Sequence, residues 1–355
     1  MAWGSKASVL AVVVMLVSPL IWDAPVSGQG TSLAQRIEAA RREGALTVYG
    51  NNLTTETFDM LAASFKRKYD LSNHRMNFQQ IKSGELIAKI DQEIAAGRVT
   101  GDAVQLSALE WYYFKLIPAG KLMKYESPEY RFYDKSREAG GYEPGYWAGN
   151  LYAFTIAYNT KMVKEIKHWN DLLDPALKGK VNIGDAPKSA TYLATYIGLR
   201  KILGVDFFQK LAAQKPVSVV SGDQLGQMIA DGEYPVGTTI VARVVDGLRK
   251  QGAPMKMVYP EEGVVLLPLP FILLADAPHP ESAKLWIDYV HSREGQLLMT
   301  RGDKLFSGRS DVPVPDPELL PDLSWIKIIR LDYKKELTPE NTAKYRKEWE
   351  SIFMR

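Results

Sequence analysis

The sequence of 355 residues contains no cysteine. This absence excludes disulfides, thiolate metal sites, a cysteine nucleophile and a lipid-modified N-terminal cysteine. Histidine is scarce as well, and the four copies (His74, His168, His279 and His291) show no paired spacing typical of a metal site. We therefore expect these histidines to be structural or surface residues, and we expect neither a metal nor a cofactor.

The chain also lacks a long block of basic residues. Its formal net charge is only +3, and the longest cluster, 66–68, ends a predicted helix, where cations suit the helix dipole. We expect no nucleic-acid partner. Beyond the N-terminal region no segment is apolar enough to span a membrane.

The first 28 residues form the one marked apolar stretch. Lys6 precedes an apolar run over 9–17, and small polar residues resume at Ser27 and Gly28. This order is typical of a secretory signal peptide. The alternative is a membrane anchor, but the run is shorter than the roughly 20 residues that a spanning helix needs. Export without cysteines fits the bacterial periplasm, where unpaired thiols are at risk of oxidation.

The remaining chain is long enough for two cores and alternates short apolar strands with amphipathic helices. This alternation predicts an α/β fold with mainly parallel sheets flanked by helices. The runs 151–158 and 263–270 are the expected crossings between two lobes. We predict a signal peptide at 1–28, a first lobe from 29–155 and 266–355, and a second lobe from 156–265. Within the second lobe, 190–203 and 204–213 are expected to form two separate helices.

Several stretches resemble the type II periplasmic solute-binding proteins of ABC importers, in the branch that contains ferric-iron, phosphonate and thiamine binders. They are Tyr158-Asn159-Thr160, the run from Trp169-Asn170-Asp171-Leu172 to Lys178-Gly179-Lys180, Ala277-Pro278-His279-Pro280-Glu281 and Ser292-Arg293-Glu294-Gly295-Gln296. The resemblance covers nearly the whole mature chain. It implies two α/β lobes, a two-segment hinge and a ligand held between closing lobes, with membrane permease subunits as partners and a monomeric protein.

The resemblance does not favour iron. In ferric-binding members, adjacent tyrosines of the second lobe bind the metal, whereas Thr238 and Thr239 stand at that place here. The only adjacent tyrosines, Tyr112 and Tyr113, lie in a predicted helix of the first lobe, and helix neighbours point about 100° apart. An iron site using Tyr152 or Tyr192 with a bound anion remains the alternative.

Candidate ligand-binding residues follow from the rule that ligands bind outside the carboxyl ends of strands in open α/β sheets. Several of these loops run directly into helix N-termini, whose free N–H groups favour an anion. With Tyr152 at the first crossing, the predicted set is Asn51, Asn52, Lys82, Ser83, Ser107, Tyr152, Lys188, Ser189, Thr191, Thr238 and Thr239.

Each candidate also has a structural interpretation. The serines and threonines could simply cap helices, and Lys82, Lys188 and the helix residue Arg243 could be solvated surface charges. Tyr152 could pack in the hinge core. Asp185 could pair with Lys188 or form a turn before Pro187. The aromatic run 111–114 could line the cleft, although a buried helix face is the commoner arrangement.

No motif of a known catalytic class is present: the chain has no Gly-x-Ser-x-Gly elbow, no His-Glu-x-x-His and no P-loop. We therefore expect a binding protein rather than an enzyme. The leading hypothesis is capture of a small polar, anionic solute for an ABC importer. The alternatives are a ferric-iron binder of the same fold and a sensory protein that docks on a membrane receptor.

Overall fold

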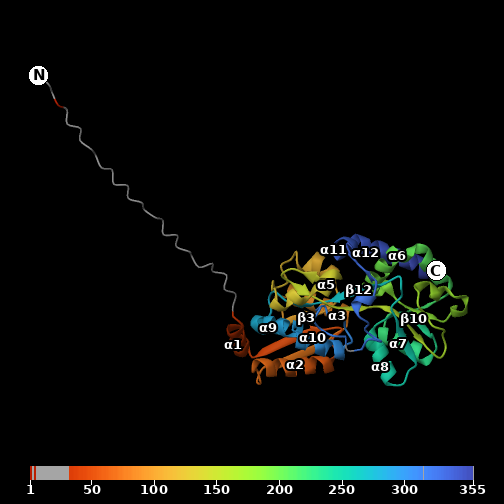
Figure 1. Ribbon diagram of the computed structural model, residues 1–355, viewed down its shortest axis with the longest axis horizontal. Helices are drawn as coiled ribbons and strands as arrows, with labels where there is room; N and C mark the ends of the chain where they lie inside the picture. Colours follow the sequence, from red (N-terminus) through yellow and green to blue (C-terminus); the bar gives the residue numbers. More distant parts are fainter. Residues whose placement is uncertain (2–3, 5–31, 315, 355) are drawn as a thin grey trace.

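A computed structural model describes residues 1, 4, 32–314 and 316–354 of the chain, and Figure 1 shows it with its longest axis horizontal. The predicted signal peptide at 1–28 lies almost entirely outside the described residues. The described residues form an α/β structure with two separate larger sheets, a three-stranded sheet at the crossings and a further two-stranded sheet. In the described part of the chain, no helix is long and apolar enough to cross a membrane.

The first sheet has the strand order β13-β3-β1-β2. Strand β1 pairs in parallel with β2 and β3, whereas β13 returns antiparallel to β3. The strands are β1 (Ala45–Gly50), β2 (Arg75–Gln80), β3 (Ala103–Gln105) and β13 (Phe271–Leu273). The helices of this part are α1 (Leu33–Glu43), α2 (Thr55–Tyr69), α3 (Ser83–Ala95), α9 (Pro280–His291) and α10 (Arg293–Gly302).

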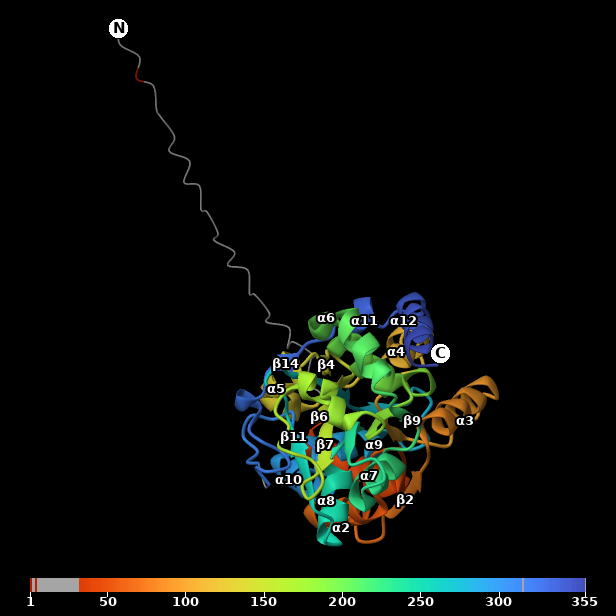
Figure 2. The ribbon, with the colours of Figure 1, turned by 90° about the vertical axis from the view of Figure 1, so that its right-hand side faces the viewer.

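Local chemistry explains where these helices begin and end. The Ser32 hydroxyl caps α1, and Gly44 ends it with φ +67°, a conformation that glycine adopts without steric cost. Thr54 caps α2 in the same way. Helix α3 buries only Leu86 and Ile90 fully, and Figure 2 shows it standing out from one side of the molecule.

The chain then passes through short elements before it crosses to the second sheet. These are α4 (Leu109–Trp111), the π-helical turn η1 (Tyr112–Leu116), η2 (Pro128–Phe132), α5 (Asp134–Glu138), β4 (Tyr142–Glu143), β5 (Trp147–Ala148), β6 (Asn150–Ala153) and β7 (Thr155–Asn159). Strand β6 pairs antiparallel with β12 (Val264–Leu269), which pairs in turn with β14 (Ile328–Ile329). The two predicted crossings therefore lie side by side as paired strands.

The second sheet has the order β11-β7-β10-β8-β9. Its strands after β7 are β8 (Val181–Gly184), β9 (Val217–Val219), β10 (Val236–Ile240) and β11 (Met255–Val258). Around them lie η3 (Trp169–Leu173), η4 (Pro175–Leu177), η5 (Ala186–Lys188), α6 (Ala190–Ala213), α7 (Gly222–Asp231) and α8 (Ala242–Lys250). Gly204 breaks α6 with φ +75° and ψ 169°, so this segment contains two helical pieces, as the sequence predicted.

The C-terminal segment spans both parts of the molecule. It contains η6 (Leu323–Trp325), α11 (Tyr333–Glu336) and α12 (Pro339–Phe353). Helix α11 contacts α4, whereas α12 packs on α6 and η5 beside the second sheet, as Figure 1 shows. Glu348 of α12 accepts hydrogen bonds from Tyr196 at 2.6 Å and Arg200 at 3.0 Å. Helix α12 therefore packs beside the second sheet, whereas the sequence-based division assigns it to the first lobe.

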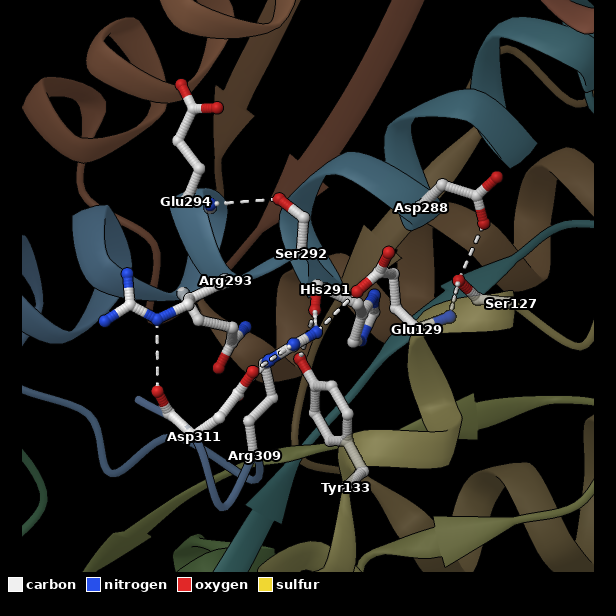
Figure 3. Close-up of polar contacts among 12 residues, drawn as sticks. Ser127, Glu129, Tyr133, Asp288, His291, Ser292, Arg293, Glu294, Arg309 and Asp311 are labelled. Atoms are coloured by element: carbon white, nitrogen blue, oxygen red, sulfur yellow. Dashed lines mark hydrogen bonds and ion pairs between the residues drawn. The ribbon is translucent and has the colours of Figure 1, made fainter. Parts of the chain in front are cut away.

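An ionic cluster around the buried Arg309 fastens the segment after α10 to the first part of the molecule (Figure 3). The Arg309 guanidinium binds Asp311 through two bonds of 2.7 Å and Glu129 at 2.5 Å. It also donates to the His291 carbonyl at 2.9 Å and lies over the Phe132 ring. Because Arg309 is only 2% exposed and each nitrogen that it presents has an acceptor, we assign this cluster a structural role.

Candidate ligand-binding site

Tyr152 occupies the crossing between the two sheets. Its side chain is 5% exposed, and its hydroxyl is buried without a hydrogen bond of normal geometry within the described residues. The side chains of Ser107, Thr191 and Asn52 approach this hydroxyl and lower its pKa, but burial has the larger effect and raises the pKa to about 12. Tyr152 is therefore a neutral hydroxyl that faces polar groups and lacks a firm partner.

The three side chains around Tyr152 come from different parts of the fold. Asn52 follows β1 and Ser107 follows β3, so both stand at the carboxyl ends of strands in the first sheet. Thr191 lies in the first turn of α6, which covers the second sheet. Four of the eleven predicted residues are thus brought together where the two sheets face each other. This is the position in which ligands collect in open α/β proteins.

The start of α6 supplies further polar groups. The Ser189 hydroxyl caps the helix by accepting from the Tyr192 N–H at 3.3 Å, and it lies 3.1 Å from the Thr191 hydroxyl. Lys188 reaches back to Asp185, with 3.0 Å between Nζ and Oδ2. The other Asp185 oxygen is buried and unpaired in the described structure. Lys188 therefore neutralises Asp185 rather than presenting a free cation.

Thr238 and Thr239 lie at an irregularity of strand β10 and are 7% and 9% exposed. The Thr239 hydroxyl is buried without a hydrogen-bond partner within the described chain. The Thr239 hydroxyl and the Tyr192 ring both lie close to Gly184. A Cβ atom added to Gly184 would stand 2.7 Å from the Thr239 Oγ1 and 2.6 Å from the Tyr192 ring. These residues line one side of a largely apolar cavity of about 40 Å³ below α6.

The remaining predicted residues lie apart from the group around Tyr152. The Asn51 amide donates to the Ile81 carbonyl at 3.2 Å and so shapes the loop before α3. Lys82 and Ser83 begin α3, and both are exposed. Arg243 pairs with Asp223 at 3.3 Å on the surface of the second part.

Aromatic side chains near Tyr152 were missing from the predicted set. Phe154 contacts Tyr152 edge-on with ring centres 5.4 Å apart, and Tyr192 contacts Phe154 in the same way at 4.7 Å. The alternation of a strand places residues 152 and 154 on one face, so the sequence carried a signal for Phe154. The run 111–114 instead packs inward: Tyr112 is fully buried and tilts against Trp147. It is mainly a buried helix face, with only Phe114 exposed.

The described residues contain no group of three His, Cys, Asp or Glu side chains able to hold a metal ion. His291 is buried between the carbonyl oxygens of Ile287 and Ala148. His279 pairs with Asp102 at 2.9 Å. His74 is buried beside Phe65. These three positions support a structural role, as expected from the sequence.

Two sheets joined by paired crossing strands, with polar strand ends and a helix start meeting between them, define the class of two-lobe binding proteins with a type II fold. Residues 112–334 match the family described as "Bacterial extracellular solute-binding protein". The chain belongs to this family, whose members bind solutes rather than transform them. The fold and the non-enzymatic function predicted from the sequence are thereby confirmed.

Individual relatives are similar to this chain in sequence or in fold. An uncharacterised protein of Haemophilus influenzae is 28% identical over 335 residues, which cover 88% of this chain and 91% of that protein. The periplasmic binding protein AfuA of Actinobacillus pleuropneumoniae, solved with fructose-6-phosphate, is 24% identical with a TM-score of 0.72, covering 87% and 98% of the two chains. Iron-bound HitA of Pseudomonas aeruginosa is 19% identical with a TM-score of 0.69, covering 87% and 99%. The two structures share the fold and bind unlike solutes.

Proposed function

We propose that this protein is the periplasmic solute-binding component of an ABC importer and that it captures a small polar, anionic solute between its lobes. The observation that carries the proposal is the meeting of Asn52, Ser107 and Thr191 around the buried hydroxyl of Tyr152, which has no hydrogen-bond partner within the described part of the chain. A buried polar group without a partner is costly. A solute that hydrogen-bonds to it removes that cost when the cleft closes.

The anionic character rests on the start of α6. The first N–H groups of a helix have no partner within the helix and carry the positive end of its dipole. The Ser189 and Thr191 hydroxyls lie at this end, and the hydroxyls of Tyr152 and Thr239, which have no partner among the described residues, are additional donors. An anionic group placed here receives hydrogen bonds from backbone and side chains together.

The remaining parts of the proposal follow from the family. The first 28 residues export the chain to the periplasm. The mature monomer consists of a first lobe, formed by 29–155 and 266–355, and a second lobe, formed by 156–265. Helix α12 belongs to the first lobe by sequence and packs against the second. Closure of the lobes on the solute is the signal that the permease subunits of the membrane read. A receptor of a sensory pathway could read the same closure.

Isothermal titration of the purified mature protein tests the solute class. The panel contains phosphonates, phosphate monoesters, carboxylates and sulfonates, with thiamine as a cation and ferric citrate as the iron arm. We expect an anion to bind and Thr191→Val to weaken it by about tenfold, since one hydrogen bond to a charged group is lost. Binding of thiamine alone contradicts the anionic solute, and a visible tyrosinate–iron colour with ferric citrate favours the iron alternative.

A further inference from the structure

Asp185 carries a buried carboxylate oxygen that the function proposed above leaves unused. The residue directly follows β8 and is 3% exposed. Lys188 binds its Oδ2 with a distance of 3.0 Å from Nζ, and the lysine side chain is itself largely exposed. The other oxygen, Oδ1, is buried and has no hydrogen-bond partner in the part of the chain that the structure describes. The ion pair therefore satisfies only one side of this carboxylate.

The backbone next to Asp185 offers Oδ1 no donor. An aspartate before a helical turn usually accepts from the N–H of the second or third residue of that turn. In η5 the second residue is Pro187, which has no N–H. The N–H of the third, Lys188, donates to the backbone carbonyl of Asp185 at 3.1 Å. The Asp185 side chain accordingly makes no capping bond, and Ser189 caps α6 in its place.

The same carboxylate lies beside the proposed anion site. Asp185 stands at the carboxyl end of β8, the end of the strand at which ligands collect in open α/β sheets. The loop 185–189 runs directly from it to the start of α6, and the ion pair with Lys188 keeps the carboxylate against this loop. Its neighbours Gly184 and Ala186 both line the cavity below α6. An anionic group at the start of α6 is therefore close to Asp185.

An acceptor of this kind requires a donor. A buried carboxylate oxygen that lacks a hydrogen bond raises the free energy of the protein, because water has been removed from it and nothing replaces that water. Pairing the other oxygen with a lysine reduces this cost without supplying the missing bond. A ligand that brings a hydroxyl or amino group to the start of α6 supplies it.

We propose that Asp185 accepts a hydrogen bond from the solute, so that the protein selects anions that carry a hydroxyl or amino group near the anionic group. This inference rests on the proposed function of the same site. The anionic group lies at the start of α6, and the donor meets Oδ1 of Asp185 at the end of β8. Asp185 thus determines specificity, whereas the start of α6 supplies the general affinity for anions.

The test compares pairs of compounds in which a methyl group replaces the donor. The pairs are aminomethylphosphonate with ethylphosphonate, 2-aminoethylphosphonate with propylphosphonate, and 2-hydroxyethyl phosphate with propyl phosphate. Titration of the wild-type protein should favour the donor-bearing member of at least one pair by about 10- to 100-fold, the range for a hydrogen bond to a charged group. In Asp185→Ala this preference should fall to within about threefold, while the member without a donor binds at least as tightly as before.

A second variant guards against damage to the fold. Asp185→Asn keeps the shape of the side chain without its charge, so the preference should fall by about fivefold or more. Both variants remove only the partner of an exposed lysine and should unfold at urea concentrations close to that of the wild type. If Asp185→Ala does not fold, Asp185→Asn decides the test.

Controls separate the possible failures. Asp276→Asn removes an exposed carboxylate that pairs with Lys121 at 3.4 Å, and it should keep the full preference. Equal binding within all pairs by the wild type, or an unchanged preference in the folded Asp185 variants, overturns the inference. If no member of any pair binds, the anionic solute fails, and 3-aminopropanol and glycerol then test Asp185 alone. Asp185-dependent binding of one of them supports the inference, and its absence overturns it.

Discussion

The indole nitrogen of Trp169 donates a buried hydrogen bond of 2.9 Å to the carbonyl oxygen of Gly263. Trp169 lies in η3, shortly after the first crossing, and Gly263 stands directly before the second crossing strand β12. Gly263 has φ +113°, and a Cβ there would lie 2.5 Å from the Lys327 carbonyl oxygen. The bond therefore ties the segment after the first crossing to the start of the second crossing, at a position that only glycine can occupy.

Trp169→Phe should lower the free energy of unfolding by about 2 kcal/mol, because it removes the donor to a buried carbonyl and part of a buried ring. Urea unfolding followed by circular dichroism measures the effect. Trp325→Phe is the matched control: this tryptophan is 78% exposed, and its loss should change stability by less than about 0.5 kcal/mol. Equal effects of the two substitutions would contradict the role of the Trp169–Gly263 bond.

Tyr152→Phe should weaken binding of the preferred anion by about tenfold or more without lowering the stability of the unliganded protein. The reason is that the hydroxyl is buried but unpartnered within the described structure, so removing it costs the free protein nothing. Titration and urea unfolding are compared in the same variant.

Tyr259→Phe provides the opposite control to Tyr152→Phe. The Tyr259 hydroxyl donates to the Leu319 carbonyl at 2.7 Å, so its loss should cost about 1 kcal/mol of stability and leave the affinity unchanged. If Tyr152→Phe instead lowers stability and keeps full affinity, Tyr152 belongs to the hinge core rather than to the ligand site.

Asp303 should make stability depend on pH between about 4 and 6. Burial raises its pKa to about 6, although hydrogen bonds from Thr54 and Thr57 to one of its oxygens lower it. The pKa of this carboxyl group is higher in the folded protein than in the unfolded chain. Such a group stabilises the fold fully at a pH below its unfolded-state pKa. This contribution is lost as the pH rises through its folded-state pKa. The change is at most about 3 kcal/mol.

Asp303→Asn keeps an oxygen that accepts from both threonines and removes the titration. Its stability relative to the wild type should therefore increase from pH 4 to pH 7, as measured by urea unfolding at both values. The exposed substitution Asp59→Asn should show no such trend. A difference between Asp303→Asn and wild type that stays constant with pH would show that Asp303 is not the titrating group.

Arg309→Met should destabilise the protein by about 2 kcal/mol, because the buried guanidinium loses its charged hydrogen bonds, while the partly exposed carboxylates of Glu129 and Asp311 can be hydrated instead. Thermal and urea unfolding measure this loss. The exposed pair Arg249–Glu318 is the control, since Arg249→Met should cost less than about 1 kcal/mol. The folded fraction of Arg309→Met should bind the solute normally, because Arg309 contacts none of the residues around Tyr152.

The sequence by itself determined the fold class, the alternation of strands and helices and the two crossings. These features depend on local periodicity and on caps such as Ser32, Thr54 and Gly44, which act within a few residues. The strand-end rule also selected Asn52, Ser107 and Thr191 among the candidates, because the ends of strands can be read from where apolar runs stop. Their meeting at one hydroxyl could not be read in this way.

Only the tertiary structure decided which candidates face each other. Lys82 and Lys188 look alike in the sequence, but one is exposed at the start of α3 and the other is held by Asp185. The placement of α12 on α6 depends on contacts between residues far apart in the chain. Such contacts are set by packing and burial across the whole molecule, and local sequence patterns carry no record of them.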